Sequence, residues 1–182
     1  MKLVKNIGEQ RVADLIKEIG KDGNVEAATT EFSIFGFSEF IDRLGSFRKI
    51  KIILPTSAAE LHSLWGNESE RNLRNKLNAQ KLSRGVLNIL KDKVELRLSK
   101  YPLPQSIIAI EDRQSARIII GHCPLTAEGL GLAPTNALGL TQISENHDEF
   151  TELRKWFESA WDSVPDDKTL SSAFIQRLEF LA

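Results

Sequence analysis

Residues 25–55 read VEAATTEFSIFGFSEFIDRLGSFRKIKIILP, and this stretch decides the fold class. Its first part (25–32) is short, rich in small and β-branched residues and bounded by turn signals, which predicts a strand. The part that follows (33–45) carries apolar residues on one helical face and ends in glycine, which predicts a short helix. KIKIILP (49–55) is an apolar run stopped by proline, which predicts a buried strand.

The flanking sequence repeats this alternation of helices and strands, which favours a sheet with parallel pairs and helical crossovers. We therefore expect an α/β fold, with a mixed β-sheet and helices on both faces. Pro165 is expected to separate the last two helices. The other predicted elements, in chain order, are a helix at 8–20, a helical stretch at 58–93 broken near Gly66, a strand at 94–99, a hairpin of 106–112 and 115–121, a loop at 121–134, a strand at 136–144, and helices at 147–164 and 167–181.

Composition excludes several classes of protein. The chain has 182 residues, enough for one domain with a core of its own. The net charge of -1 and pI of about 6.3 give no overall preference for nucleic acid or an acidic membrane. A single cysteine, Cys123, rules out an internal disulfide framework and fits a reducing cytoplasm. No apolar run approaches the roughly 18 residues of a membrane span, so we expect a soluble cytoplasmic protein.

Several segments resemble, in order, the phospholipase D-like domains at the N-terminus of some bacterial and archaeal helicases. KNIGEQRVADLIKEI resembles their lead-in helix, VEAATTEFSIFGFSEFIDRL their first strand and helix, and RKIKIILP their second strand. IIIGHCPLTAEGLG stands where the family has a strand, Gly-Ser-x-Asn and a Thr-x-x-Gly-Leu tail, and LRKWFESAW resembles its closing helix. The resemblance implies one half-domain of the phospholipase D/nuclease kind over 1–164, followed by a C-terminal helical extension at 165–182.

The resemblance also implies a chemistry that this chain lacks. The family uses a His-x-Lys pair, whose histidine attacks phosphorus and whose lysine binds phosphate oxygens. The alignment places Leu103 at the histidine and Gln105 at the lysine, but leucine has no lone pair and glutamine has no charge. In the second motif His122 and Cys123 replace small polar residues and Pro124 replaces asparagine.

His122 and Cys123 could instead suggest a thiol nucleophile or a metal site. Adjacent residues at a strand end point to opposite faces, however, and two ligands are too few for zinc. We therefore expect no catalytic residue, no metal and no cofactor. His62 and His147 lie far away in predicted helices, where surface positions are expected.

A basic run between residues 71 and 100 is the strongest remaining binding signal. Four of its residues fall at spacings that can share one helix side and contact phosphates: Arg71, Arg74, Lys81 and Arg84. The alternative, which we weigh more heavily, is an ordinary solvated helix face. Trp156 and Trp161 are five residues apart and cannot both face one helix side, so one of them could mark a partner surface.

The leading functional hypothesis is a non-catalytic accessory domain of a DNA-processing protein, of the helicase or restriction type. Its partner would be nucleic acid, a second copy of the chain, or a helicase domain or subunit. Two alternatives stay open: an active nuclease or phosphodiesterase with substitute residues, and a scaffold that recruits another protein.

Overall fold

The structure is a computed structural model that describes residues 1–8, 10–17, 22–44, 47–66, 68–73, 76–136 and 138–182. Seven strands are formed within these residues: β1 (Lys2–Val4), β2 (Asn24–Ala28), β3 (Lys49–Pro55), β4 (Val94–Ser99), β5 (Ser106–Glu111), β6 (Ala116–Gly121) and β7 (Thr141–Ser144). The α-helices are α1 (Val12–Lys17), α2 (Ile34–Leu44), α3 (Leu61–Leu64), α4 (Lys76–Lys93), α5 (His147–Ser163) and α6 (Lys168–Leu181). Two 3-10 helices precede α3 and α4, namely η1 (Thr56–Ala59) and η2 (Glu68–Leu73).

One sheet contains all these strands, in the order β1-β7-β6-β5-β2-β3-β4. β2, β3 and β4 are parallel, and the other neighbouring pairs are antiparallel. The carboxyl ends of the parallel strands therefore meet the start of β5 and the end of β6 at one edge. Ligands of open α/β sheets bind at such an edge, which makes it the first place to look for a site.

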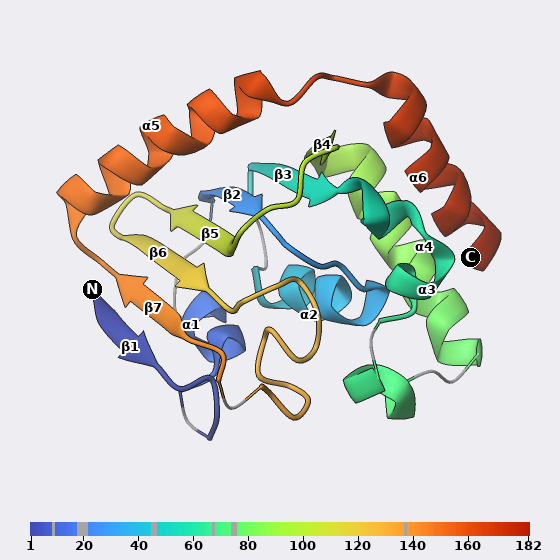
Figure 1. The fold of residues 1–182 in the computed structure, drawn as a ribbon, viewed down its shortest axis with the longest axis horizontal. Coiled ribbons are helices and arrows are strands. Elements are labelled where there is room, and N and C mark those ends of the chain that lie inside the picture. The colour runs from blue at the N-terminus through green and yellow to red at the C-terminus, as the bar shows by residue number, and fades with distance from the viewer. Residues whose placement is uncertain (9, 18–21, 45–46, 67, 74–75, 137) are drawn as a thin grey trace.

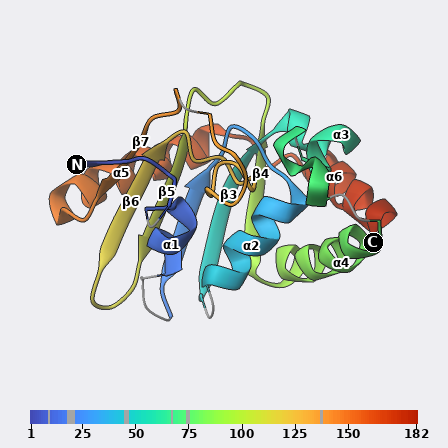
Figure 2. The same ribbon diagram turned by 90° about the horizontal axis from the view of Figure 1, so that it is seen from below.

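Helices cover both faces of this mixed sheet, so the predicted fold class is confirmed. Figure 2 shows α1, α2 and α4 in front of the sheet and α5 behind it. The larger core lies under α1, α2 and α4, whereas α5 buries Phe157 and Trp161 against Ala28 and Ile53. α6 lies beside α4 and adds the buried side chains of Phe174, Leu178 and Leu181 to the larger core (Figure 1).

Polar side chains cap the first turns of three helices by accepting hydrogen bonds from backbone amides. The Ser33 hydroxyl accepts a hydrogen bond from the amide of Gly36, which satisfies a free donor in the first turn of α2. Asn146 does the same for two amides of α5, and Asp167 for two amides of α6. α5 ends at Ser163, just before the expected break at Pro165.

Several predicted boundaries are wrong. The stretch 58–93 divides at Gly66, as predicted, where a φ of +77° favours glycine. It is not two long helical pieces, however, because several short helices precede α4. The predicted strand at 136–144 begins only at Thr141, and the strand at 25–32 ends at Ala28. β1 was not predicted, and Gly20, the predicted end of the first helix, lies outside the described residues. Within the described ranges, no helix is both long and apolar enough to span a membrane.

Glu26 is a nearly buried carboxyl group on the sheet face under α5, and it makes stability depend on pH. Burial raises its pKa, and the nearby Arg154 and Lys51 offset this only in part. Because its pKa is raised on folding, Glu26 holds its proton more tightly in the folded state than in the unfolded state. The stabilisation that proton binding gives to the folded state is therefore greatest below the unfolded pKa and is lost as pH rises. We expect Glu26→Gln to increase the free energy of unfolding at pH 7 and to leave it unchanged near pH 4.

Urea unfolding at both pH values measures this effect. Glu95→Gln is the matched control, because Glu95 lies on the same sheet but has 51% of its side chain exposed beside Lys49. That variant should stay within about 0.5 kcal/mol of the wild type at both pH values. A Glu26→Gln protein that is less stable than the wild type at pH 7 would show that the attraction of Glu26 to Arg154 and Lys51 outweighs the cost of its burial.

Candidate functional site

The sheet register brings two of the predicted site positions together at the carboxyl edge. Ser106 of β5 pairs with Gly121 of β6, so the next residues in the same register are Gln105 and His122. On the other side of β5, the pairing with β2 places Thr30 next to this point, where its amide donates to the Ser106 hydroxyl at 3.0 Å. Residues distant in the sequence thus form one polar row across the edge.

Leu103 and Pro124 flank this row but lie on loops. Leu103 and Gln105 precede β5, which begins at Ser106 as the predicted strand does. Leu103 packs against the small cluster of Ala28, Ile53, Phe157 and Trp161. None of Leu103, Gln105 and Pro124 carries a group that can attack phosphorus or bind a phosphate through a full positive charge.

His122 is held in place by the loop that follows β6. Its Nε2 lies 3.6 Å from Oε1 of Glu128, and its ring fits so closely to Gly139 that an added Cβ there would stand 2.5 Å from the ring. Glu128 Oε1 also accepts the amide of Asn136 at 3.0 Å. The Nε2 atom of His122 is buried and makes no hydrogen bond to any residue that the structure describes, and its neighbour Cys123 points into the core. In the described part of the chain, no group of three or more His, Cys, Asp or Glu residues could hold a metal ion.

Cys123 should be unreactive in the folded protein. Its side chain is fully buried, and burial raises the pKa of the thiol to about 12. Since the thiolate is the reactive form, we expect iodoacetamide to label it at least about a hundredfold more slowly than an exposed cysteine. The Ser172→Cys variant supplies the exposed cysteine for comparison, because residue 172 is exposed on α6. The variant is labelled while folded, and mass spectrometry measures the labelling of both cysteines. Equal labelling of both cysteines would contradict the burial of Cys123.

Two adjoining hollows extend along the carboxyl edge, and we call them together the edge groove. Their volumes are about 250 and 210 Å³, and both are lined by Thr30, Pro55 and Ser57. Hydroxyl groups dominate the polar lining. Other residues that line the groove are Glu31, Phe32, Thr56, Ala58, His62, Ser63, Gly66, Ser99, Lys100, Tyr101, Pro102, Leu103 and Thr126.

Charged and aromatic groups stand at the rim of the edge groove. Tyr101 is 82% exposed, and the Ser99 hydroxyl holds its loop by accepting the Tyr101 amide at 3.2 Å. Lys100 is exposed and lies 3.6 Å from Asp167. His62 is also exposed, beside Glu60. His147 does not line the groove but is likewise exposed, at the start of α5, so the predicted surface positions of both histidines are confirmed.

A buried carboxylate supports the far wall of the groove. Glu70 is inaccessible to solvent, and one of its oxygens accepts the Ser33 hydroxyl at 2.6 Å and the Ala127 amide at 2.7 Å. Glu70 therefore ties η2 to the start of α2 and to the loop after β6. Sequence reasoning missed both this residue and the groove hydroxyls. The available signal was that Thr30, Thr56 and Ser99 stand at the carboxyl ends of parallel strands.

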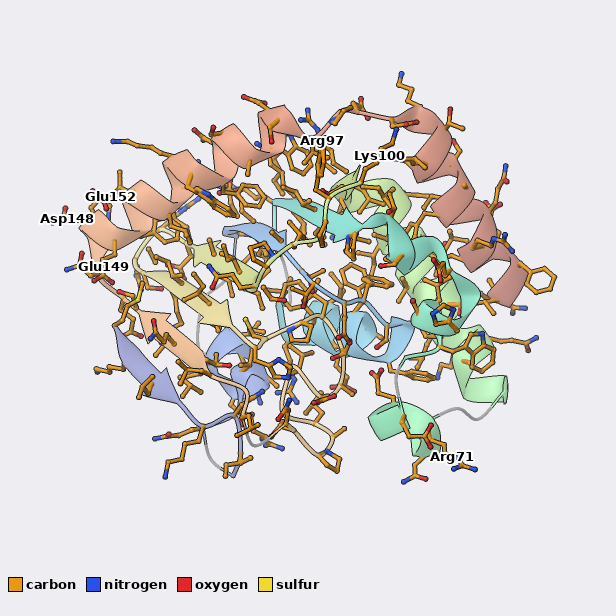
Figure 3. The ribbon with its side chains drawn as sticks, viewed as in Figure 1. Arg71, Arg97, Lys100, Asp148, Glu149 and Glu152 are labelled. Atoms are coloured by element: carbon orange, nitrogen blue, oxygen red, sulfur yellow. The ribbon has the colours of Figure 1, made fainter. Side chains whose placement is uncertain are left out.

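The described residues of the predicted basic stripe do not all lie on one helix. Arg71 lies on η2, where it pairs with Glu68 at 3.2 Å, whereas Lys81 and Arg84 lie on α4. Arg84 donates to the backbone carbonyl of Ala182 at 2.6 Å. Arg74 lies outside the described residues. Figure 3 shows Arg71 far from Lys100, so Arg71 does not share a surface with the edge groove.

Comparison with known proteins gives little further information. No protein-family model matches the chain, and no curated protein matches it. One similar solved structure is that of TrmBL2, described as an archaeal chromatin protein with a novel mode of DNA binding. The likeness covers 90% of this chain and 51% of TrmBL2, at 17% identity and a TM-score of 0.46. The chain thus spans about half of that protein, and a likeness this distant carries no argument about function.

Proposed function

We propose that this chain is a non-catalytic phospholipase D-like domain of a DNA-processing protein, and that it binds nucleic acid along the edge groove. One observation supports this most strongly. The positions that the family resemblance assigns to phosphate chemistry lie around one sheet edge, yet they carry Leu103, Gln105, His122 and Pro124 in place of the His-x-Lys pair and the Gly-Ser-x-Asn residues. In this proposal the backbone keeps the location of a phosphate site, whereas the side chains at these positions do not pair a nucleophile with a cation.

The groove lining suits binding to a phosphate chain. Ser and Thr hydroxyls, backbone amides and lysine are the groups that most often contact nucleic-acid phosphates. Lys100 supplies positive charge at the rim, and Thr30 and Ser57 line both hollows of the groove. The exposed ring of Tyr101 offers a surface on which an unpaired base can stack. These features favour a single strand over a duplex.

Fluorescence anisotropy of labelled single-stranded and duplex DNA, titrated against salt, tests this proposal. We expect tighter binding to the single strand and weaker binding as salt increases. Lys100→Ala should reduce the slope of log affinity against log salt by about one, because one phosphate contact is lost. Tyr101→Ala should weaken single-strand binding about tenfold and leave the slope unchanged.

Lys81→Ala and Arg84→Ala on α4 are the matched controls. Both residues are exposed and basic but lie away from the groove, so their variants should bind like the wild type. Loss of binding in these variants, with Lys100→Ala unaffected, would move the interface to α4 and reject the groove. Absence of binding at about 50 mM salt would reject nucleic acid as the ligand.

A further inference from the structure

An apolar hollow lies on the α5 side of the sheet and adjoins the edge groove, with which it shares the lining residues Ser99, Lys100, Tyr101 and Leu103. Its volume is about 390 Å³, and we call it the α5 hollow. Its lining is mostly aliphatic and aromatic: Ala28, Ile53, Leu98, Leu103, Trp156, Ala160 and Val164, with Ser99, Lys100, Tyr101, Ser163, Pro165 and Asp167 at the remaining positions. A hollow of this composition gains free energy when apolar side chains fill it.

The two tryptophans of α5 behave differently beside this hollow. Trp161 is 7% exposed, stacks on Phe157 with centroids 6.1 Å apart, and has Arg97 over its ring at 4.5 Å. Trp156 is 46% exposed in the middle of the same helix. Its indole is therefore available to a partner, and exposed tryptophans next to a pocket are typical centres of protein interfaces.

Toward the carboxyl end of α5, the side chains that follow Trp156 on the same face of the helix are small. At 100° per residue, Ala160 and Ser163 lie within about a quarter turn of Trp156. A second α5 packed antiparallel there meets small side chains, with the α5 hollow beside them. A two-fold axis that passes between Trp156 and Ala160 would place each indole over the hollow of the other chain.

Charged residues near the two ends of α5 fit this antiparallel arrangement, with Lys100 lying 3.6 Å from Asp167 of its own chain. Figure 3 shows Asp148, Glu149 and Glu152 at the start of the helix, and Arg97 and Lys100 near its other end. Glu152 is exposed and lies on the same side of α5 as Trp156, whereas Asp162 is about a third of a turn away. The two-fold axis would therefore bring Glu152 of each chain toward Lys100 of the other.

We propose that a second copy of this chain docks antiparallel on α5, with Trp156 filling the α5 hollow of its partner and Glu152 facing Lys100 across the interface. This inference does not require nucleic-acid binding and its tests contain no DNA, but Lys100 and Tyr101 line both the α5 hollow and the edge groove. It selects a symmetric partner because one surface carries both the projecting indole and the hollow, and both the acidic and the basic end.

Sedimentation equilibrium over micromolar to submillimolar protein tests the dimer. The wild type should reach twice the 20.4 kDa of one chain. Trp156→Ala should raise the dimer dissociation constant by about thirtyfold or more. Phe180→Ala is the matched control, because Phe180 is 79% exposed on α6 and away from α5, so this variant should dimerise like the wild type. A wild type that stays monomeric, or a dimer insensitive to Trp156→Ala, overturns the proposal.

A charge exchange tests the orientation. Glu152→Lys and Lys100→Glu should each weaken self-association, because each places like charges opposite one another. Mixing these two single variants should restore association as a heterodimer, in which both contacts again join opposite charges. Far-ultraviolet circular dichroism of each variant confirms that it is folded. Failure of the mixture to associate, with both variants folded, overturns the antiparallel arrangement.

Discussion

Phe174→Ala should lower the free energy of unfolding by about 3–5 kcal/mol. Phe174 is fully buried in α6, and its ring meets the Phe32 ring edge-on at a centroid distance of 5.5 Å. Truncation to alanine removes apolar burial and leaves a cavity between α6 and the central part of the fold. Urea unfolding followed by circular dichroism at neutral pH measures the loss.

Phe180→Ala is the matched change on the same helix. Phe180 is 79% exposed, so the same truncation should alter stability by less than about 0.5 kcal/mol. A large loss at residue 174 and a small one at residue 180 would show that α6 contributes to the main core. Similar small effects at both positions would mean that 165–182 is only loosely attached.

Gly36→Ala should cost about 3 kcal/mol or more, although it adds one methyl group. A Cβ on Gly36 would stand 2.2 Å from the Cα of Thr126, and that atom belongs to backbone that no rotamer change can move. The start of α2 and the loop after β6 would have to separate. The same loop carries the bond from the Ala127 amide to Glu70, so the change would also disturb that buried carboxylate.

Gly85→Ala supplies the opposite expectation. An added Cβ at Gly85 meets no atom within 4 Å, and this exposed residue lies within α4. Alanine is a better helix former than glycine, so this variant should be more stable by about 0.5–1 kcal/mol. Thermal unfolding of both variants measures the contrast. If Gly36→Ala unfolds at the same temperature as the wild type, the close contact between α2 and Thr126 is absent.

The sequence patterns were most informative where local signals are dense. The predicted strands at 49–55 and 94–99 agree with β3 and β4, because an apolar run ending in proline and a clear alternation mark them. β1 has only three residues, with Leu3 exposed, and it is held by pairing with the distant β7. No local pattern could indicate a strand that exists only through such a pairing.

The candidate site was predictable only in part. The positions of Gln105 and His122 relative to each other follow from one hairpin, which the sequence indicates. Thr30 and Ser99 reach the same edge only through crossovers, and in the sequence they resemble ordinary turn residues. The expectation of one shared helix side is wrong for Arg71, which lies on η2 and not on α4, because the spacing rule assumed one continuous helix.

One measurement tests most directly whether this sheet edge binds phosphate chains without cleaving them. Labelled single-stranded DNA is incubated with the protein at about 50 mM salt, and both the bound fraction and the strand length are read from the same sample. We expect bound DNA of unchanged length, with binding reduced by Lys100→Ala. Shortened DNA whose formation stops with His122→Ala, or DNA that stays unbound, would contradict this expectation.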